Sequence, residues 1–268
     1  MEKSALPDRK HRALAALAGI VLLSTAGAAA AGTLSDYRLL VLGDGIVKWG
    51  APERGTGAVV TYAVANRGAT FDGARNCTEV VPIDDMLAES GISRQDFDSE
   101  VAAAFRSWSA VANVAFEPAP QATADILIGS EAEPRGWAFT NVAHRPATGA
   151  GESGTIVGSV ICLNPGRTWK IGFDGNLDVY DLRYTLMHEI GHAIGLDHPG
   201  VPGEVMDFRY EESFSSLQAG DRAGVVDLYG PRIVTADAPA VAPPAPDDFV
   251  GGPILVDEGR GFEAGSDE

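Results

Sequence analysis

Three of the five histidines in this 268-residue chain lie within eleven positions, in the segment HEIGHAIGLDH. His188 and His192 are four positions apart, so on a helix both imidazoles leave the same face, with Cβ atoms ~5–6 Å apart, and can reach one ion. Gly195 can adopt the left-handed conformation that ends a helix, and the reversed chain can then bring His198 up as a third ligand. Three neutral nitrogens suit zinc and leave its fourth tetrahedral position open for water, which is typical of a catalytic site.

Glu189 directly follows the first of these histidines, where its carboxylate flanks the ion instead of pointing at it. It can therefore hydrogen-bond a water in the open coordination position and act as a general base. Zinc lowers the pKa of such a water to ~7, and the carboxylate can take its proton and return it to a leaving amine. The spacing thus predicts amide hydrolysis without a covalent intermediate.

This segment, followed eight residues later by Met206 in EVMDFRY, resembles the metzincin clan of zinc endopeptidases, in which a methionine-containing turn lies beneath the metal. Three features are similar to those of the matrixins: the short gap to Met206, the later segment LQAGDRAGVVDLYG and the upstream segment FRSWSAVANVAFEPA. The resemblance covers about residues 48–231. It implies one catalytic zinc ion and a polypeptide substrate. By position, it assigns zinc binding to His188, His192 and His198, catalysis to Glu189, structural support to Gly195 and Met206, and a place on the wall of the specificity pocket to Tyr210.

Several residues depart from the matrixin pattern. Pro199, directly after the third histidine, is more like a serralysin, but the glycine-aspartate repeats of serralysins are missing, and Phe208 stands where serralysins and astacins carry a tyrosine. The stretch that binds the second, structural zinc of matrixins offers only His144, so one zinc ion is expected. The cysteine that caps the zinc of latent matrixins has no counterpart in residues 32–49.

Strand and helix patterns alternate along the middle of the chain. β-Branched and aromatic residues predict strands, and apolar residues at three- and four-residue intervals predict helices with one apolar face. The strands are expected at 58–65, 114–117, 124–129, 136–143 and 155–163, and the helices from Ser93, at 178–194 with Asp178 as a cap, and at 217–228. Together with the resemblance, they imply an α+β, metzincin-type fold: a twisted, mostly parallel five-stranded sheet with two long helices, then a small C-terminal subdomain with the Met-turn and final helix. An extended substrate is expected to add along an edge strand, 136–143.

The two ends of the chain differ in composition from its middle. A basic start, an uncharged apolar run from Ala13 and the small residues 27–32 predict a signal peptide over residues 1–31, with an uncleaved anchor as the alternative. A short N-terminal segment, 32–49, and a matrixin-like catalytic domain, 50–234, are expected to follow. Residues 235–268 are acidic and rich in Pro, Ala and Gly, which predicts a flexible tail. Secretion is expected, with periplasmic retention or surface display left open.

Two further clusters carry structural hypotheses. In an exported protein Cys77 and Cys162, 85 positions apart, favour a disulfide over two buried free thiols. The oxygen-rich segment FDGNLDVYD, residues 173–181, can hold calcium, although capping of the next helix by Asp178 explains part of its composition.

The charge of the chain restricts its partners. Thirty-seven acidic against 20 basic side chains give a formal net charge of −17, which argues against nucleic acid because phosphate binding needs clustered Lys and Arg. A monomer that leaves the membrane after signal cleavage is expected. The sequence therefore predicts a secreted zinc endopeptidase, the alternative being a secreted zinc-binding interaction or matrix protein with a vestigial protease site.

Overall fold

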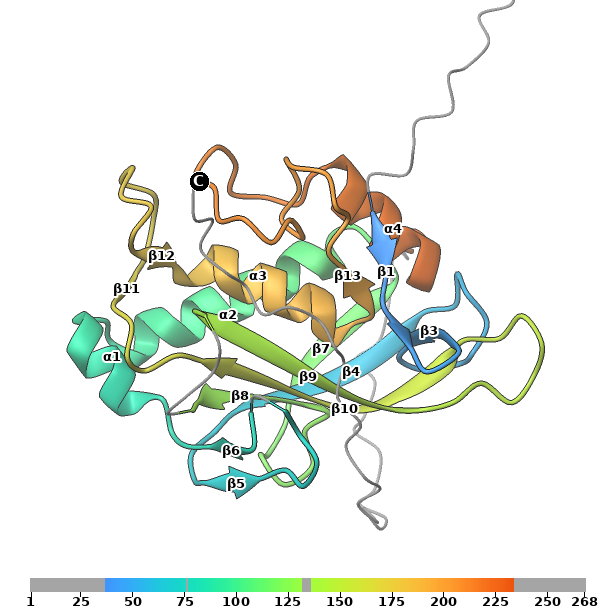
Figure 1. Cartoon of the computed structure of the whole chain (residues 1–268), viewed down its shortest axis with the longest axis horizontal. Helices are drawn as coiled ribbons and strands as arrows, with labels where there is room; N and C mark the ends of the chain where they lie inside the picture. Colours follow the sequence, from blue (N-terminus) through green and yellow to red (C-terminus); the bar gives the residue numbers. More distant parts are fainter. Residues whose placement is uncertain (1–36, 76, 132–135, 234–268) are drawn as a thin grey trace, which may run out of the picture. The chain divides into compact units, whose positions relative to one another are not determined.

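The computed structural model describes residues 37–75, 77–131 and 136–233 (Figure 1). The predicted signal peptide and the acidic tail lie outside these residues. Within the described ranges, none of the helices has the length and apolar character needed to cross a membrane.

A mostly parallel sheet forms the centre of the fold (Figure 1). Five strands lie side by side in the order β9-β10-β8-β4-β7; β10, β8, β4 and β7 are parallel, and β9 runs antiparallel to β10 at the edge. Their bounds are β4 Ala58–Val64, β7 Val114–Pro118, β8 Ile126–Ser130, β9 Ala138–Arg145 and β10 Gly154–Leu163. The expected α+β class and mostly parallel sheet are confirmed, with strand ends within two residues of the predicted ones. The antiparallel edge strand is the one expected to bind substrate.

The N-terminal segment belongs to the same fold. β2 (Val41–Leu42) and β3 (Gly45–Lys48) extend the sheet to seven strands, because β3 runs parallel to the start of β10. β1 (Arg38–Leu39) pairs antiparallel with β13 (Leu196–Asp197). Trp49 is buried and its indole N–H donates to the carbonyl of Ala193, 2.8 Å away. Residues 37–49, which the sequence analysis placed before the catalytic domain, therefore pack into the same fold.

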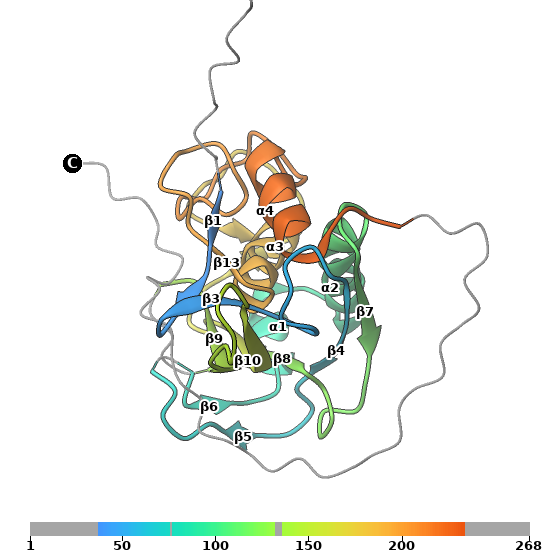
Figure 2. The same cartoon turned by 90° about the vertical axis from the view of Figure 1, so that its right-hand side faces the viewer.

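Two long helices cover one face of the sheet (Figures 1 and 2). α2 (Arg94–Ser109) begins at Ser93, whose hydroxyl accepts a hydrogen bond from the backbone N–H of Asp96. α3 (Leu182–Ala193) packs against it, and the Trp108 indole N–H donates to the carbonyl of Met187 at 3.0 Å. A short helix, α1 (Asp84–Ser90), precedes α2, and α4 (Ala219–Tyr229) is the expected final helix.

The start of α3 differs from the prediction. The Asp181 carboxylate accepts a hydrogen bond from the Tyr184 backbone N–H at 2.8 Å and caps the helix. Asp178 lies four residues before Leu182, the first helical residue, so it cannot reach the orphan N–H groups of the first turn. The expected cap at Asp178 is wrong. The two residues before α3, Tyr180–Asp181, instead form β12, parallel to β11 (Trp169–Lys170).

The opposite face of the sheet carries a smaller apolar cluster. The hairpin of β5 (Ala69–Thr70) and β6 (Glu79–Val80) lies on this face, away from α2 and α3 (Figures 1 and 2). Val80 and Cys77 pack there against side chains of β8, β9 and β10, while the main core lies on the helix side. Cys77 and Cys162 are joined by a disulfide across this cluster, with Cα atoms 6.2 Å apart.

Candidate metal centre

Three imidazoles converge on one point. His188 and His192 leave the same face of α3, and His198 follows β13, the short strand after the helix. The Nε2 atoms of all three rings are 3.1 Å from one another. Tetrahedral bonds of ~2.0–2.1 Å to zinc require nitrogens ~3.3 Å apart. The three histidines therefore fit one zinc ion with little movement.

Backbone carbonyls set the orientation of two of these rings. The His188 Nδ1–H donates to the carbonyl of Val205 at 2.7 Å, and the His192 Nδ1–H donates to the carbonyl of Leu196 at 2.9 Å. Since a carbonyl only accepts, each Nδ1 holds the proton and each Nε2 lone pair is left for a metal. Burial lowers the pKa of His188 well below 6.5 and that of His198 to about 3, with the charge of His192 acting in the same direction. Burial thus favours the neutral, metal-binding form.

Gly195 makes the turn that returns His198. Its φ is +101°, and a Cβ at this position would lie 2.3 Å from the carbonyl oxygen of Val47. Only glycine fits both the left-handed conformation and this approach. The Gly195 carbonyl accepts a hydrogen bond from the Leu40 backbone N–H at 2.8 Å, so the N-terminal segment supports the turn that leads to the third histidine.

The Glu189 carboxylate is buried beside these ligands, with 1 % of the residue exposed. Its Oε2 accepts a hydrogen bond from the Thr140 hydroxyl on β9 at 2.6 Å. Its Oε1 has no partner among the residues that the structure describes. Burial raises the pKa of Glu189, while the His192 charge and the Thr140 hydrogen bond lower it by smaller amounts. Thr140 was not found by sequence reasoning, because nothing local marks a threonine 49 residues before Glu189.

Met206 lies against the helix between the two ligands of α3. Its backbone N–H and that of Val205 donate to the Asp221 carboxylate at the start of α4, at 3.0 and 2.9 Å. A Cβ placed on Gly191 would be 2.1 Å from the Met206 sulfur and 3.0 Å from the Trp108 ring. Glycine at 191 therefore lets the turn around Met206 approach α3 directly.

This packing predicts the effect of Gly191→Ala. Alanine favours helices by ~1 kcal/mol over glycine, but overpacking a buried site costs ~1–3 kcal/mol. We expect a net loss of stability in urea unfolding of the zinc-free protein. Gly45→Ala, where a Cβ meets nothing within 4 Å, is the control and should leave the midpoint unchanged. An unchanged midpoint for Gly191→Ala would contradict this packing.

Tyr210 lies in a buried aromatic stack. Its ring stacks on Tyr180 at 4.1 Å, and Tyr180 stacks on Trp137 at 4.0 Å. The Tyr210 hydroxyl accepts from the Asp181 backbone N–H at 3.0 Å and donates to Glu212 at 2.7 Å. The residue thus supports the capped end of α3, and its role in a specificity pocket stays a prediction.

A lysine side chain from outside the predicted calcium segment, residues 173–181, binds oxygens of that segment. The Lys170 ammonium bonds to the Asp174 carboxylate, to the Asn176 carbonyl at 2.7 Å and to the Glu212 carboxylate at 2.5 Å. Asp181 is occupied as the cap of α3. A lysine therefore takes the place among these oxygens that the hypothesis gave to a metal, and the calcium prediction gains no support.

Two other residues from the sequence analysis lie near the site or the edge strand. Phe208 is 39 % exposed, with its ring 6.4 Å from the His198 ring. His144 is partly buried near the end of β9, and burial lowers its pKa. Within the described ranges, His144 is not grouped with other potential metal ligands.

The fold and site define a class of protein. The site is a metzincin-type zinc site with three parts. A helix carries two histidines and a glutamate, a turn at a glycine returns a third histidine, and a turn that contains a methionine packs against the helix. Residues 84–230 match the sequence model of the matrixins, peptidase family M10, and the chain belongs to this family.

Curated relatives agree with this assignment. Mouse matrilysin is 32% identical over 152 residues, which cover 53% of this chain and 54% of matrilysin. Human matrix metalloproteinase-20 is 29% identical over 182 residues, 65% of this chain and 36% of that protein. Metalloendoproteinase 1-MMP of Arabidopsis thaliana is 34% identical over 153 residues, covering 53% and 40% of the two chains. The chain thus matches about half or less of the length of these relatives.

Proposed function

We propose that this chain is a secreted zinc-dependent endopeptidase that hydrolyses peptide bonds in extended polypeptides. The observation that carries the proposal is the convergence of three imidazole nitrogens 3.1 Å apart beside a buried carboxylate. Membership of the matrixins supports the reaction class.

The side chains divide the work of hydrolysis. His188, His192 and His198 would hold zinc, which when bound polarises a peptide carbonyl and acidifies a water molecule. Glu189 acts as the general base: its Oε1 takes a proton from the attacking water and returns it to the nitrogen of the leaving amine. Burial raises the pKa of this carboxylate, which makes it a stronger base toward the proton of the water.

The edge strand β9 is the proposed binding strand for an extended substrate. Among the described strands only β10 pairs with β9, and it occupies one side of the strand. Backbone groups on the other side can pair with a substrate strand. Thr140, in the middle of β9, contacts Glu189, so a peptide bound along this strand passes close to the base.

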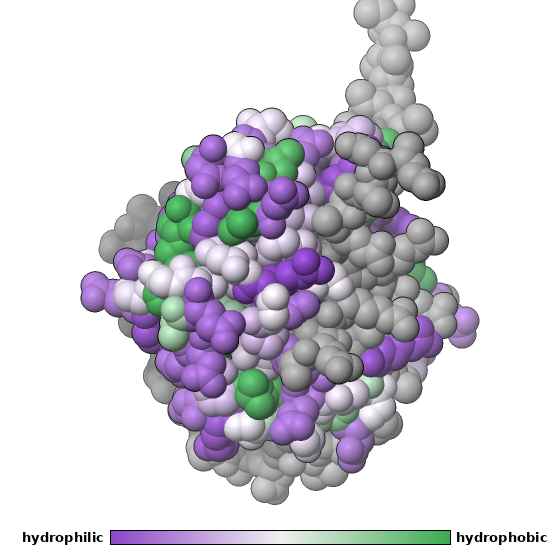
Figure 3. Space-filling model, turned by 60° about the vertical axis from the view of Figure 1, so that its left-hand side comes forward, coloured by the Kyte–Doolittle hydropathy of each residue, from purple (hydrophilic) through white to green (hydrophobic). Residues whose placement is uncertain are grey.

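The proposal extends to export and to the monomeric state. The predicted leader at residues 1–31 and the Cys77–Cys162 disulfide both fit an oxidising, extracytoplasmic compartment. On the face drawn in Figure 3, hydrophobic residues are scattered among hydrophilic ones. Scattered apolar residues are normal for a monomer.

The test is digestion of casein by the protein, expressed in a host that exports it and then purified. We expect cleavage that 1,10-phenanthroline abolishes and added zinc restores, with one zinc per chain by elemental analysis. Stoichiometric zinc without cleavage of casein or gelatin would favour a vestigial, zinc-binding interaction or matrix protein. Absence of any zinc uptake would refute both.

A further inference from the structure

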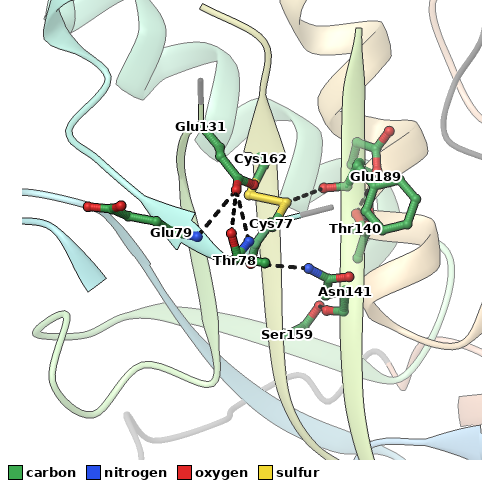
Figure 4. The surroundings of a disulfide bond; sticks show 10 residues. Cys77, Thr78, Glu79, Glu131, Thr140, Asn141, Ser159, Cys162 and Glu189 are labelled. Atoms are coloured by element: carbon green, nitrogen blue, oxygen red, sulfur yellow. Dashed lines mark hydrogen bonds between the residues drawn. A yellow bond between two sulfur atoms is a disulfide. The ribbon is translucent and has the colours of Figure 1, made fainter. Parts of the chain in front are cut away.

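We propose that Thr140 is a positioning residue for the general base: its hydroxyl holds one oxygen of Glu189 and so commits the other to proton transfer. The inference rests on the proposed function, because it concerns the carboxylate assigned there as the base. Figure 4 shows the two side chains together, with Thr140 reaching from β9 toward α3.

The hydrogen bond makes the two oxygens of Glu189 different. The Thr140 hydroxyl donates to Oε2 at 2.6 Å, a length typical of a bond to a charged carboxylate, and lies 3.1 Å from the main-chain oxygen of the same residue. Both residues are buried, with 6 % and 1 % exposed. No described residue contacts Oε1 through a hydrogen bond. One oxygen is thus anchored, and the other is left for the attacking water.

The threonine is itself held from the far side of the sheet. The two residues next to Thr140 in the sequence both contact Cys77. The Asn141 side-chain amide donates to the Cys77 carbonyl at 3.4 Å, and the Phe139 carbonyl oxygen lies 3.6 Å from the Cys77 sulfur. The Ser159 hydroxyl on β10 donates to the Asn141 carbonyl at 2.9 Å. Figure 4 shows Cys77 and its disulfide to Cys162 on one side of β9 and the Thr140 hydroxyl on the other. Because a β-branched side chain is also stiff about χ1, the donor has a fixed place.

Thr140→Val tests the hydroxyl with little change of shape. Without the donor, the Glu189 carboxylate can rotate away from its working orientation, and misplacement of a catalytic group by ~1 Å costs ~100-fold. We expect kcat for a quenched fluorescent peptide to fall about 10- to 100-fold with KM within twofold. Thr140→Ser keeps the donor and should recover kcat to within about threefold of the wild type.

Thr185→Val is the matched control. It also removes a buried threonine hydroxyl, one on α3 that donates to the Asp181 carbonyl at 3.0 Å and makes no bond to Glu189. We expect its kcat to stay within about twofold of the wild type. All variants should keep one zinc per chain. Loss of zinc from Thr140→Val would overturn the inference, since the hydroxyl would then support the ligands instead.

A structural measurement separates this inference from the proposed function. Crystal structures of the zinc-free wild type and Thr140→Val should show the Glu189 carboxylate ordered in the first and displaced or multiply oriented in the second. An unmoved carboxylate overturns the inference, as does an unchanged kcat in an active enzyme. If the wild type hydrolyses no peptide, the proposed function fails, and the two structures still decide whether Thr140 positions Glu189.

Discussion

Replacing Glu189 by glutamine is expected to lower kcat for peptide hydrolysis by about 10²- to 10⁴-fold, the usual contribution of a general base. Glutamine has the same shape, and its amide oxygen can still accept the Thr140 hydrogen bond. It cannot take a proton from water at neutral pH, however. The three imidazoles are untouched, so zinc content should stay at one per chain.

The measurement compares kcat of Glu189→Gln with that of Glu131→Gln. Glu131 is another buried carboxylate, and its Oε1 accepts hydrogen bonds from the backbone N–H and hydroxyl of Thr78, away from the metal centre. The control should lose no more than about twofold in kcat, because it contacts no group of the reaction. Turnover by zinc-loaded Glu189→Gln at the wild-type rate would remove the assigned role from this residue.

The metal centre could be predicted from sequence because it is local. His188, His192 and His198 fall within one helix and the turn that follows it, so the helical period and one glycine define their convergence. The positive φ of Gly195 meets the expectation derived from its place in the motif. The matrixin family and the catalytic zinc are confirmed, and the motif that indicates them is short and contiguous. The α+β class is also confirmed, because strand and helix patterns are local even though they are spread over residues 58–228.

Contacts between distant segments could not be predicted in this way. Thr140 reaches Glu189 only because β9 lies at the edge beside α3, which no spacing in the sequence reveals. The N-terminal segment did carry a signal, since Gly43 and Asp44 separate two short apolar runs as in a hairpin. Its pairing with β10 and β13 is non-local, and the sequence pattern does not reveal it.

The start of α3 shows a different limit. Asp178 and Asp181 are both good capping residues, and sequence alone does not rank them. Pairing of Tyr180–Asp181 with β11 keeps the chain extended up to Asp181, which leaves only the second aspartate in a capping position. Tertiary structure thus decides between two local alternatives.

The disulfide is expected to make the largest single contribution to stability. Cys77 and Cys162 close a loop of 85 residues, and the loop-entropy estimate for this length is ~4–5 kcal/mol, with ~2–5 kcal/mol typical when a native disulfide is removed. Cys77→Ala/Cys162→Ala keeps small apolar side chains in the buried cluster, so it tests the cross-link with little loss of packing. We expect a loss of about 2–5 kcal/mol in the free energy of unfolding, measured in urea.

The wild type with its disulfide reduced is the control for the double variant. It keeps both sulfur atoms in the apolar cluster. A similar loss of unfolding free energy in both proteins therefore assigns the effect to the covalent bond, and any additional loss in the alanine variant comes from the missing sulfur packing. Since Cys77 also contacts both neighbours of Thr140, kcat of the folded double variant should fall as well. The prediction is wrong if the oxidised wild type, the reduced wild type and the double variant unfold at the same urea midpoint. The disulfide would then add nothing to the free energy of unfolding.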